Sequence, residues 1–114
     1  MGYRCRWRFI GRNEKNHPNE LKAVFENLSK YVSTLEKGVK PVLIQMGCIH
    51  PEKKGAISID QRGQKGRLMQ TRLYLFADET TQTLHLITLG DKRTQSEDIK
   101  ECNEYIEKLR KENK

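Results

Sequence analysis

The sequence is poor in apolar residues and has no long apolar run. Only 35% of its 114 residues are hydrophobic, whereas 32% are charged. No stretch approaches the roughly 18 consecutive apolar residues that a membrane-spanning helix needs. No hydrophobic signal-peptide segment follows the N-terminus either, so we expect no membrane partner. The apolar residues that are present follow regular spacings, which indicates a folded chain and not a disordered one.

Cysteine is also scarce. The three cysteines, Cys5, Cys48 and Cys102, are odd in number and widely spaced, and none belongs to a C-x-x-C pair. This pattern argues against a zinc site and against a disulfide framework. We therefore predict a reduced, soluble, cytoplasmic protein without a metal or other cofactor. The sequence lacks internal repeats and linkers, and its length suits one core, so we predict a single domain over residues 1–114.

Positive charge is abundant and unevenly distributed. The formal net charge is +7, and residues 1–12 carry four arginines without an acid. Residues 37–72 carry eight cations against two acids, whereas the segments 13–36 and 73–114 sum to −1 and −2. This concentration favours a polyanionic partner on the sheet side of the molecule over a basic surface that only maintains solubility.

The first third of the sequence predicts a strand followed by a helix. Residues 3–9 alternate strictly between apolar or aromatic residues and arginines, which is the period of a strand. A helix is expected from Pro18, capped by Asn16 or His17, to the vicinity of Gly38. Its apolar stripe follows the i, i+3, i+4, i+7 spacing. The members of this stripe are Leu21, Val24, Phe25, Leu28, Tyr31, Val32 and Leu35.

The remaining sequence predicts three or four antiparallel strands and a second helix. Residues 41–44 fit a strand or a helical turn, and residues 56–60 fit a short strand. A hairpin is expected from residues 72–76 and 83–89. A capping box of Thr94 and Glu97 then opens a C-terminal amphipathic helix, although Ser96 is an alternative cap. The predicted fold class is α+β: a small antiparallel sheet of 4–5 strands packed by a long N-terminal helix and a C-terminal helix.

The corner at residues 90–93 combines features of an anion site. Lys92 and Arg93 follow a predicted buried strand and precede a helix N-terminus. Cations at such a position suit an anion such as an RNA phosphate.

The order of elements, together with residues 71–99, resembles the RelE/HigB group of the RelE/ParE superfamily of toxins. The resemblance rests on the segment Thr71 to Asp78, on the apolar strand Leu84 to Gly90, and on the segment Asp91 to Gln95 that opens the last helix. It implies a RelE-like domain that acts as the toxin of a type II toxin–antitoxin system. It further implies a ribosome-associated, metal-independent mRNA endoribonuclease, an mRNA interferase. The implied partners are a cognate antitoxin, mRNA and the ribosome, and operator DNA only through the antitoxin complex.

The resemblance also implies roles for particular residues. Arg72 matches the strand arginine that contacts the scissile phosphate, and Lys92 or Arg93 matches the basic residue that stabilises the transition state. The lysine pair of RelE itself would fall near Ser58 and Asp60, and its helix tyrosine would fall near Ile99; both features are absent. These departures leave the general base unassigned.

Two histidines are candidates for proton transfer. A histidine can move a proton near neutral pH, and an arginine offers planar donors to a phosphate. His50 lies in a predicted loop, where functional residues are common. His85 lies in a predicted central strand, where a hydrogen-bonded core histidine is the alternative.

The other cations are candidates for RNA binding. Arg4, Arg6 and Arg8 could line an RNA groove, meet an acidic antitoxin, or form a solvated strand face. The candidates on loops, suited to contacting successive phosphates, are Lys53, Lys54, Arg62, Lys65 and Arg67. Two other functions stay open: a ParE-like toxin that inhibits DNA gyrase without cutting, and a non-catalytic RNA- or protein-binding module on this fold.

Overall fold

The computed structural model describes residues 2–8, 18–65 and 69–112 of the chain. Within these residues, five strands form one sheet in the order β1-β5-β4-β3-β2. The strands are β1 (Arg4–Trp7), β2 (Ile49–Pro51), β3 (Ile57–Ile59), β4 (Thr71–Asp78) and β5 (Thr83–Asp91). The α-helices are α1 (Pro18–Glu36) and α2 (Gln95–Glu112), and the 3₁₀ turns are η1 (Pro41–Leu43), η2 (Lys53–Gly55) and η3 (Lys92–Thr94).

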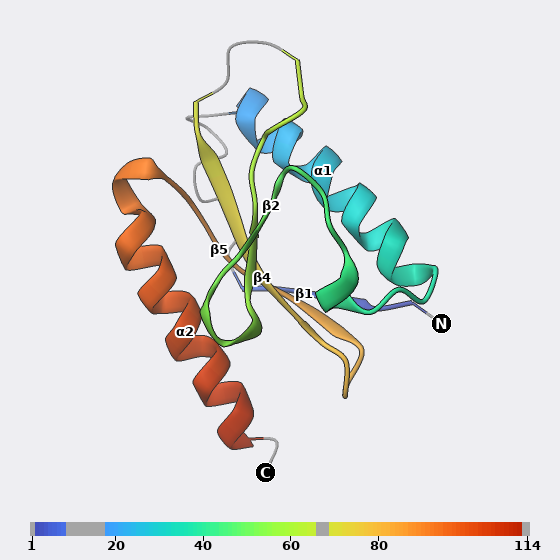
Figure 1. Ribbon diagram of the computed structural model, residues 1–114. Coiled ribbons are helices and arrows are strands. Elements are labelled where there is room, and N and C mark those ends of the chain that lie inside the picture. The colour runs from blue at the N-terminus through green and yellow to red at the C-terminus, as the bar shows by residue number, and fades with distance from the viewer. Residues whose placement is uncertain (1, 9–17, 66–68, 113–114) are drawn as a thin grey trace.

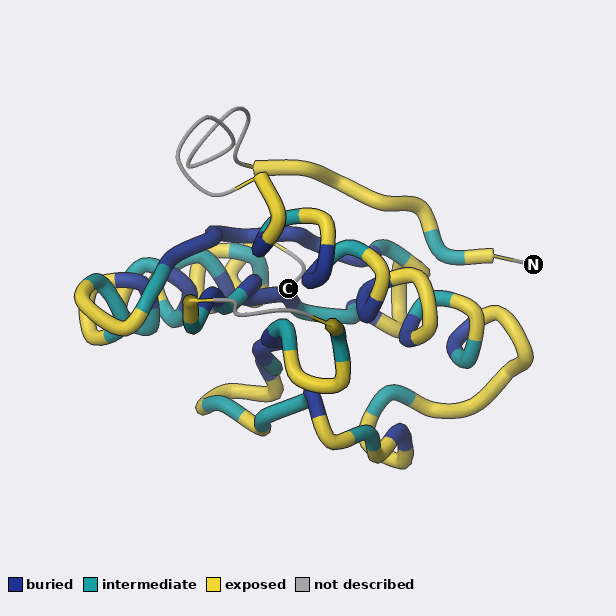
Figure 2. The backbone as a smooth tube through the Cα atoms, turned by 90° about the horizontal axis from the view of Figure 1, so that it is seen from above, coloured by how far each residue is buried: buried dark blue, intermediate teal, exposed yellow. Residues whose placement is uncertain are grey.

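The two helices lie on opposite faces of the sheet (Figure 1). The apolar stripe of α1, including Val24, Leu28 and Tyr31, packs on one face against Leu73, Leu75 and other strand residues. On the other face, Cys102 and Ile106 of α2 pack against Tyr74 and Ile87. The expected α+β fold, with its two helices and its β4–β5 hairpin, is therefore present. Figure 2 shows the buried residues concentrated between these layers.

The prediction of a wholly antiparallel sheet is wrong at one edge. The pairs β2–β3, β3–β4 and β4–β5 are antiparallel, but β1 pairs with β5 in parallel, with Arg4 opposite Thr83 and Trp7 opposite Leu86. β1 is short and all four of its residues are exposed, as Figure 2 shows for the N-terminal segment. The side chains at this edge still alternate between the two faces as predicted. Trp7 contacts Phe25 of α1, while Arg8 contacts Glu101 of α2. Phe9, Asn16 and His17 lie outside the described residues.

The element boundaries elsewhere follow local chemistry. α1 ends at Glu36, and Gly38 adopts a φ of +92°, the left-handed conformation that favours glycine after a helix. Residues 41–43 form a 3₁₀ turn, not a strand. None of the described helices is long and apolar enough to cross a membrane.

The expected capping box of Thr94 and Glu97 is replaced by a different arrangement. Asp91 caps the η3 turn by accepting hydrogen bonds from the backbone N–H groups of Arg93 and Thr94. The Thr94 hydroxyl accepts from the Asp91 backbone N–H and lies 2.6 Å from Oδ2 of the buried Asp98. Asp91 supplies the same type of side-chain cap three residues earlier than the sequence pattern suggested, because the 3₁₀ turn precedes α2.

Candidate functional site

Arg72 lies on the face of β4 against which α2 packs, and its side chain is largely buried. Its Cα partner on β5 is Gly90. One terminal nitrogen of its guanidinium lies 3.7 Å from the Glu52 carboxylate, and the two side chains are 17% and 13% exposed. Glu52 also accepts a hydrogen bond of 2.8 Å from the hydroxyl of Ser58. The arginine that the sequence singled out therefore has an acidic partner from the β2–β3 connection.

His50 and Asp60 form a second polar pair beside the first. The Nε2 atom of His50 lies 2.6 Å from Oδ2 of Asp60, and their side chains are 23% and 3% exposed. The prediction that His50 lies in a loop is wrong, because the residue belongs to strand β2. It is opposite Ser58 in the β2–β3 pairing, so both side chains lie on the same face of the sheet. Asp60 also accepts a hydrogen bond of 2.8 Å from the backbone N–H of Arg62. The buried carboxylate of Asp60 thus orients the partly exposed imidazole of His50.

These residues define a polar cluster at the β2–β3 side of the sheet. We call His50, Glu52, Ser58, Asp60 and Arg72 the edge cluster. It combines an oriented imidazole, a second carboxylate and a guanidinium around one serine. These are the groups that general acid–base chemistry at a phosphate uses.

Asn27 supports the edge cluster from the opposite face of the sheet. Its amide nitrogen donates to the carbonyls of Asp60 at 2.8 Å and Arg62 at 3.1 Å, and its carbonyl accepts from Gln64 at 2.8 Å. The side chain of Asn27, which belongs to α1, is buried, so each of its polar groups needs a hydrogen-bond partner. These bonds fix the turn that carries Asp60.

Two buried donors in this region lack partners. In the part of the chain that the structure describes, neither Arg72 Nε nor the Tyr74 hydroxyl has a hydrogen-bond partner. Burial raises the pKa of Tyr74 to about 12, with Glu52 adding to the rise, so its hydroxyl stays protonated at neutral pH. Unsatisfied buried donors at a polar cluster are a feature of sites that receive a ligand or an ordered water.

The cations of the corner at residues 90–93 lie in the η3 turn. Arg93 is 81% exposed and pairs with Asp91 at 3.0 Å. Its hydrogen bond to Asp91 lowers the pKa of that carboxyl. Lys92 is exposed. No contact among the described residues joins either cation to Arg72, so the structure links Arg72 to Glu52 and Arg93 to Asp91.

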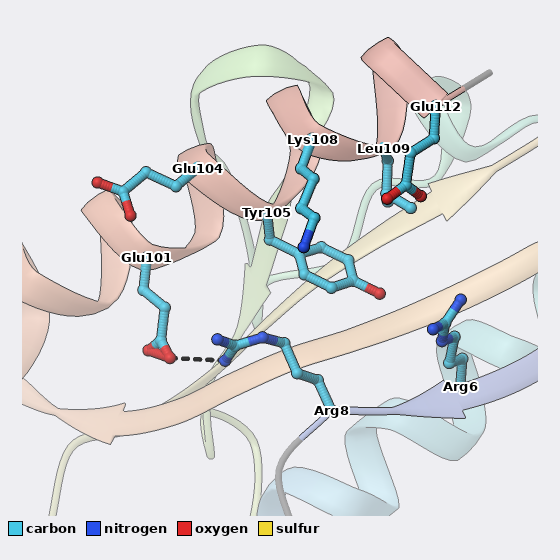
Figure 3. Close-up of a pocket in the computed structure, with 8 residues that line it drawn as sticks. All are labelled: Arg6, Arg8, Glu101, Glu104, Tyr105, Lys108, Leu109 and Glu112. Atoms are coloured by element: carbon cyan, nitrogen blue, oxygen red, sulfur yellow. Dashed lines mark hydrogen bonds and ion pairs between the residues drawn. The ribbon is translucent and has the colours of Figure 1, made fainter.

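Arg6 of β1 and Arg8, which directly follows this strand, face α2 across a groove of about 330 Å³ (Figure 3). Arg8 pairs with Glu101 at 2.6 Å, and its guanidinium lies 5.7 Å from the Tyr105 ring centroid. Arg6 lines the same groove, and Arg4 lines an adjoining hollow. The carboxylates of Glu101, Glu104 and Glu112 also line the groove, so its charge is mixed.

His85 is a buried core histidine. It is 3% exposed, its Nδ1 lies 2.9 Å from the Tyr105 hydroxyl, and its ring stacks on Phe76 at 6.3 Å. Burial lowers the pKa of His85 below its usual value of 6.5. The structural alternative considered for this residue therefore fits its position, on the β1 flank of α2 and away from the edge cluster.

A pH-dependent stability follows from His85. Because the folded-state pKa is lowered, neutral His85 contributes stability above pH 6.5 that is lost as the pH falls through the folded-state pKa. A His85→Gln variant should therefore show a shallower loss of stability below pH 6.5 in urea unfolding. NMR titration of His85 in the wild type should give a midpoint below 6.5, and a midpoint above it would contradict this assignment.

The loop cations that the structure describes lie on exposed turns. Lys54 pairs with Glu107 of α2, and Arg62 donates to the carbonyl of Gly47 at 3.3 Å. Lys53 and Lys65 are exposed. Arg67 lies outside the described residues. Arg62 lies two residues after Asp60, and its backbone N–H donates a hydrogen bond to the Asp60 carboxylate. Arg62 therefore lies beside the edge cluster.

Two polar regions, the edge cluster and the arginine groove, lie on the sheet face that α2 covers, one on each side of this helix. It packs over β5 and β4, so the edge cluster lies on its β2–β3 flank and the arginine groove on its β1 flank. The sequence identified Arg72 and His50 but missed Glu52, Ser58, Asp60 and Asn27. Two signals were available: Glu52 and Asp60 are the only acids in the basic segment 37–72, and Asn27 is a polar residue inside the apolar stripe of α1.

The described residues hold no group of three or more His, Cys, Asp or Glu side chains arranged to bind a metal ion. Comparison of the chain with protein-family models, with curated proteins and with solved structures finds no match in any of the three.

Proposed function

We propose that the protein is a metal-independent endoribonuclease whose chemistry is carried by the edge cluster. The observation that supports this most is the position of two pairs, His50–Asp60 and Glu52–Arg72, around Ser58 on one sheet face. RNA cleavage of this type needs a base for the 2′-hydroxyl, a cation for the phosphate and an acid for the leaving oxygen. The cluster contains one candidate for each.

The roles follow from the contacts. Glu52 accepts the proton of the 2′-hydroxyl as that oxygen attacks the phosphorus. Arg72 contacts Glu52 through one nitrogen at 3.7 Å, so other donors of its guanidinium can bind the phosphate oxygens. His50, oriented by Asp60, donates a proton to the departing 5′-oxygen. The products are a 2′,3′-cyclic phosphate and a 5′-hydroxyl.

The wider proposal is a toxin of a toxin–antitoxin system. Its support is the resemblance of residues 71–99 to the RelE/HigB group, together with the net charge of +7. On this proposal mRNA at the ribosome is the substrate, a cognate antitoxin is the partner, and the exposed Lys53, Arg62 and Lys65 contact the RNA backbone. Arg93 and Lys92 remain predicted contributors to phosphate binding.

The test is cleavage of a defined RNA by the purified protein, first on free RNA in EDTA and then on ribosome-bound RNA in a magnesium buffer. We expect products that end in a 2′,3′-cyclic phosphate, and no cut at a site that carries a 2′-deoxy nucleotide. His50→Ala and Glu52→Gln should each slow cleavage about 100-fold or more. Lys22→Ala removes an exposed charge on α1 and serves as the matched control. Growth inhibition by a wild-type protein that never cuts RNA would instead favour the gyrase-inhibiting or binding alternatives.

A further inference from the structure

Strand β4 extends beyond its neighbour β3. β3 pairs only with residues 73–75 of β4. Phe76, Ala77 and Asp78 continue to pair with β5 on one side, and no described strand pairs with them on the other. Backbone N–H and C=O groups on such an open edge can accept an added strand.

A cavity lies against this open edge. Its volume is about 460 Å³, within the range of ligand-binding cavities. Its apolar lining includes Tyr31 from α1, Ile49 and Ile57 from β2 and β3, and Ala77 from β4. The cavity therefore offers apolar surface directly beside unpaired backbone.

Exposed apolar residues gather next to the cavity. Val39, Val42 and Leu43 are 37%, 82% and 66% exposed, and Val42 lines the cavity itself. Among the described residues, the other large apolar side chains with comparable exposure are Trp7 and Met69. A concentration of exposed apolar residues in one short segment is characteristic of an interaction surface.

The charge around the cavity is negative although the chain is basic. Asp78 and Glu79 line it, and so does Glu52, whose carboxylate is already paired with Arg72. Glu79 is exposed and forms no ion pair with any described residue. These carboxylates repel RNA phosphate and favour a cationic group, so the charge complementarity points to a basic and apolar protein segment.

We propose that this cavity binds an extended segment of a partner protein, which adds as a strand beside residues 76–78. An apolar side chain of the segment enters the cavity, and a neighbouring Lys or Arg faces Glu79. Main-chain hydrogen bonds supply affinity in this mode of recognition, and the side-chain contacts supply specificity. The proposal does not rest on RNA cleavage.

The probe is the peptide acetyl-Lys-Val-Lys-Val-Lys-amide, titrated into the full ¹⁵N-labelled chain and followed by NMR. We expect chemical-shift changes concentrated at residues 39–44 and 76–79, and slower hydrogen exchange at outward-facing amides of residues 76–78. The matched peptide with Glu in place of Lys should bind at least tenfold more weakly. Equal binding of the two peptides, or shifts centred elsewhere, would overturn the proposal.

Surface variants locate the contacts without disturbing the core. Val42→Ser should weaken binding about fivefold because it removes apolar contact area, and Glu79→Gln about two- to threefold because it removes one exposed charge. Met69→Ser alters an exposed apolar residue elsewhere and should leave binding unchanged. An equal loss with Met69→Ser contradicts the assignment. A concentration-dependent dimer that Val42→Ser abolishes would assign the surface to a second copy of the chain instead.

Discussion

Replacing Arg72 by alanine is expected to slow RNA cleavage by about 10²–10³-fold, since it removes a preorganised donor from the developing phosphorane charge. Growth inhibition by the expressed protein should be lost in parallel. Arg72→Lys keeps the charge but loses the planar donor geometry, so it should recover only part of the rate. Rates are measured with the defined RNA under single-turnover conditions.

Two controls separate this effect from misfolding and from total charge. Arg72→Ala leaves the enclosed Glu52 without its cation, so its melting temperature must be measured beside the rate. Lys22→Ala removes the same charge from an exposed position on α1 and should retain the wild-type rate. A folded Arg72→Ala protein that cleaves at the wild-type rate would remove Arg72 from the mechanism.

Gly90→Ala is expected to lower the free energy of unfolding by about 2–3 kcal/mol. A Cβ atom at Gly90 would lie 1.8 Å from Oδ2 of Asp98 and 2.5 Å from the Thr94 hydroxyl. Asp98 is buried and within hydrogen-bond distance of Thr94, so relieving the overlap breaks the link that fixes the start of α2. Thermal unfolding should show a decrease of about 10 °C in the melting temperature.

Gly47→Ala is the matched control for this prediction. A Cβ atom at Gly47 would meet only the Cδ of Arg62, at an ordinary contact distance of 3.9 Å. Its melting temperature should therefore stay close to that of the wild type. Equal stability of the Gly90→Ala variant would mean that Asp98 can move without loosening α2.

The elements with local signals were predictable from the sequence. The spacing of Leu21 to Leu35 specifies α1, and the apolar strands around a short polar tip specify the β4–β5 hairpin, which the structure places at residues 71–78 and 83–91. The direction of β1 was not predictable, because alternation determines which face a side chain occupies but not which strand is the neighbour. Its pairing with β5 depends on contacts across most of the chain.

The candidate site was predictable only in its cations. Charge clustering and resemblance identified Arg72, and the prediction of a loop, which the structure corrects to strand β2, drew attention to His50. The carboxylates that meet them are brought together by the register of β2, β3 and β4, through pairs such as His50–Ser58 and Ser58–Tyr74. The register of short strands is not visible in a single sequence. The sequence therefore shows Glu52 and Asp60 only as two acids within a basic segment, and not as partners of Arg72 and His50.

The parallel pairing of β1 with β5 also has a consequence for biosynthesis. Arg4 must wait for Thr83 to be made before it can pair. At translation rates of about 5–20 residues per second, β1 therefore remains without its partner for roughly 4–16 s after it is synthesised. The hairpin of β4 and β5 spans only a short tip and can close first. During that interval the side chains of Arg4, Arg6 and Trp7 lack the β5 neighbours that they have in the folded protein.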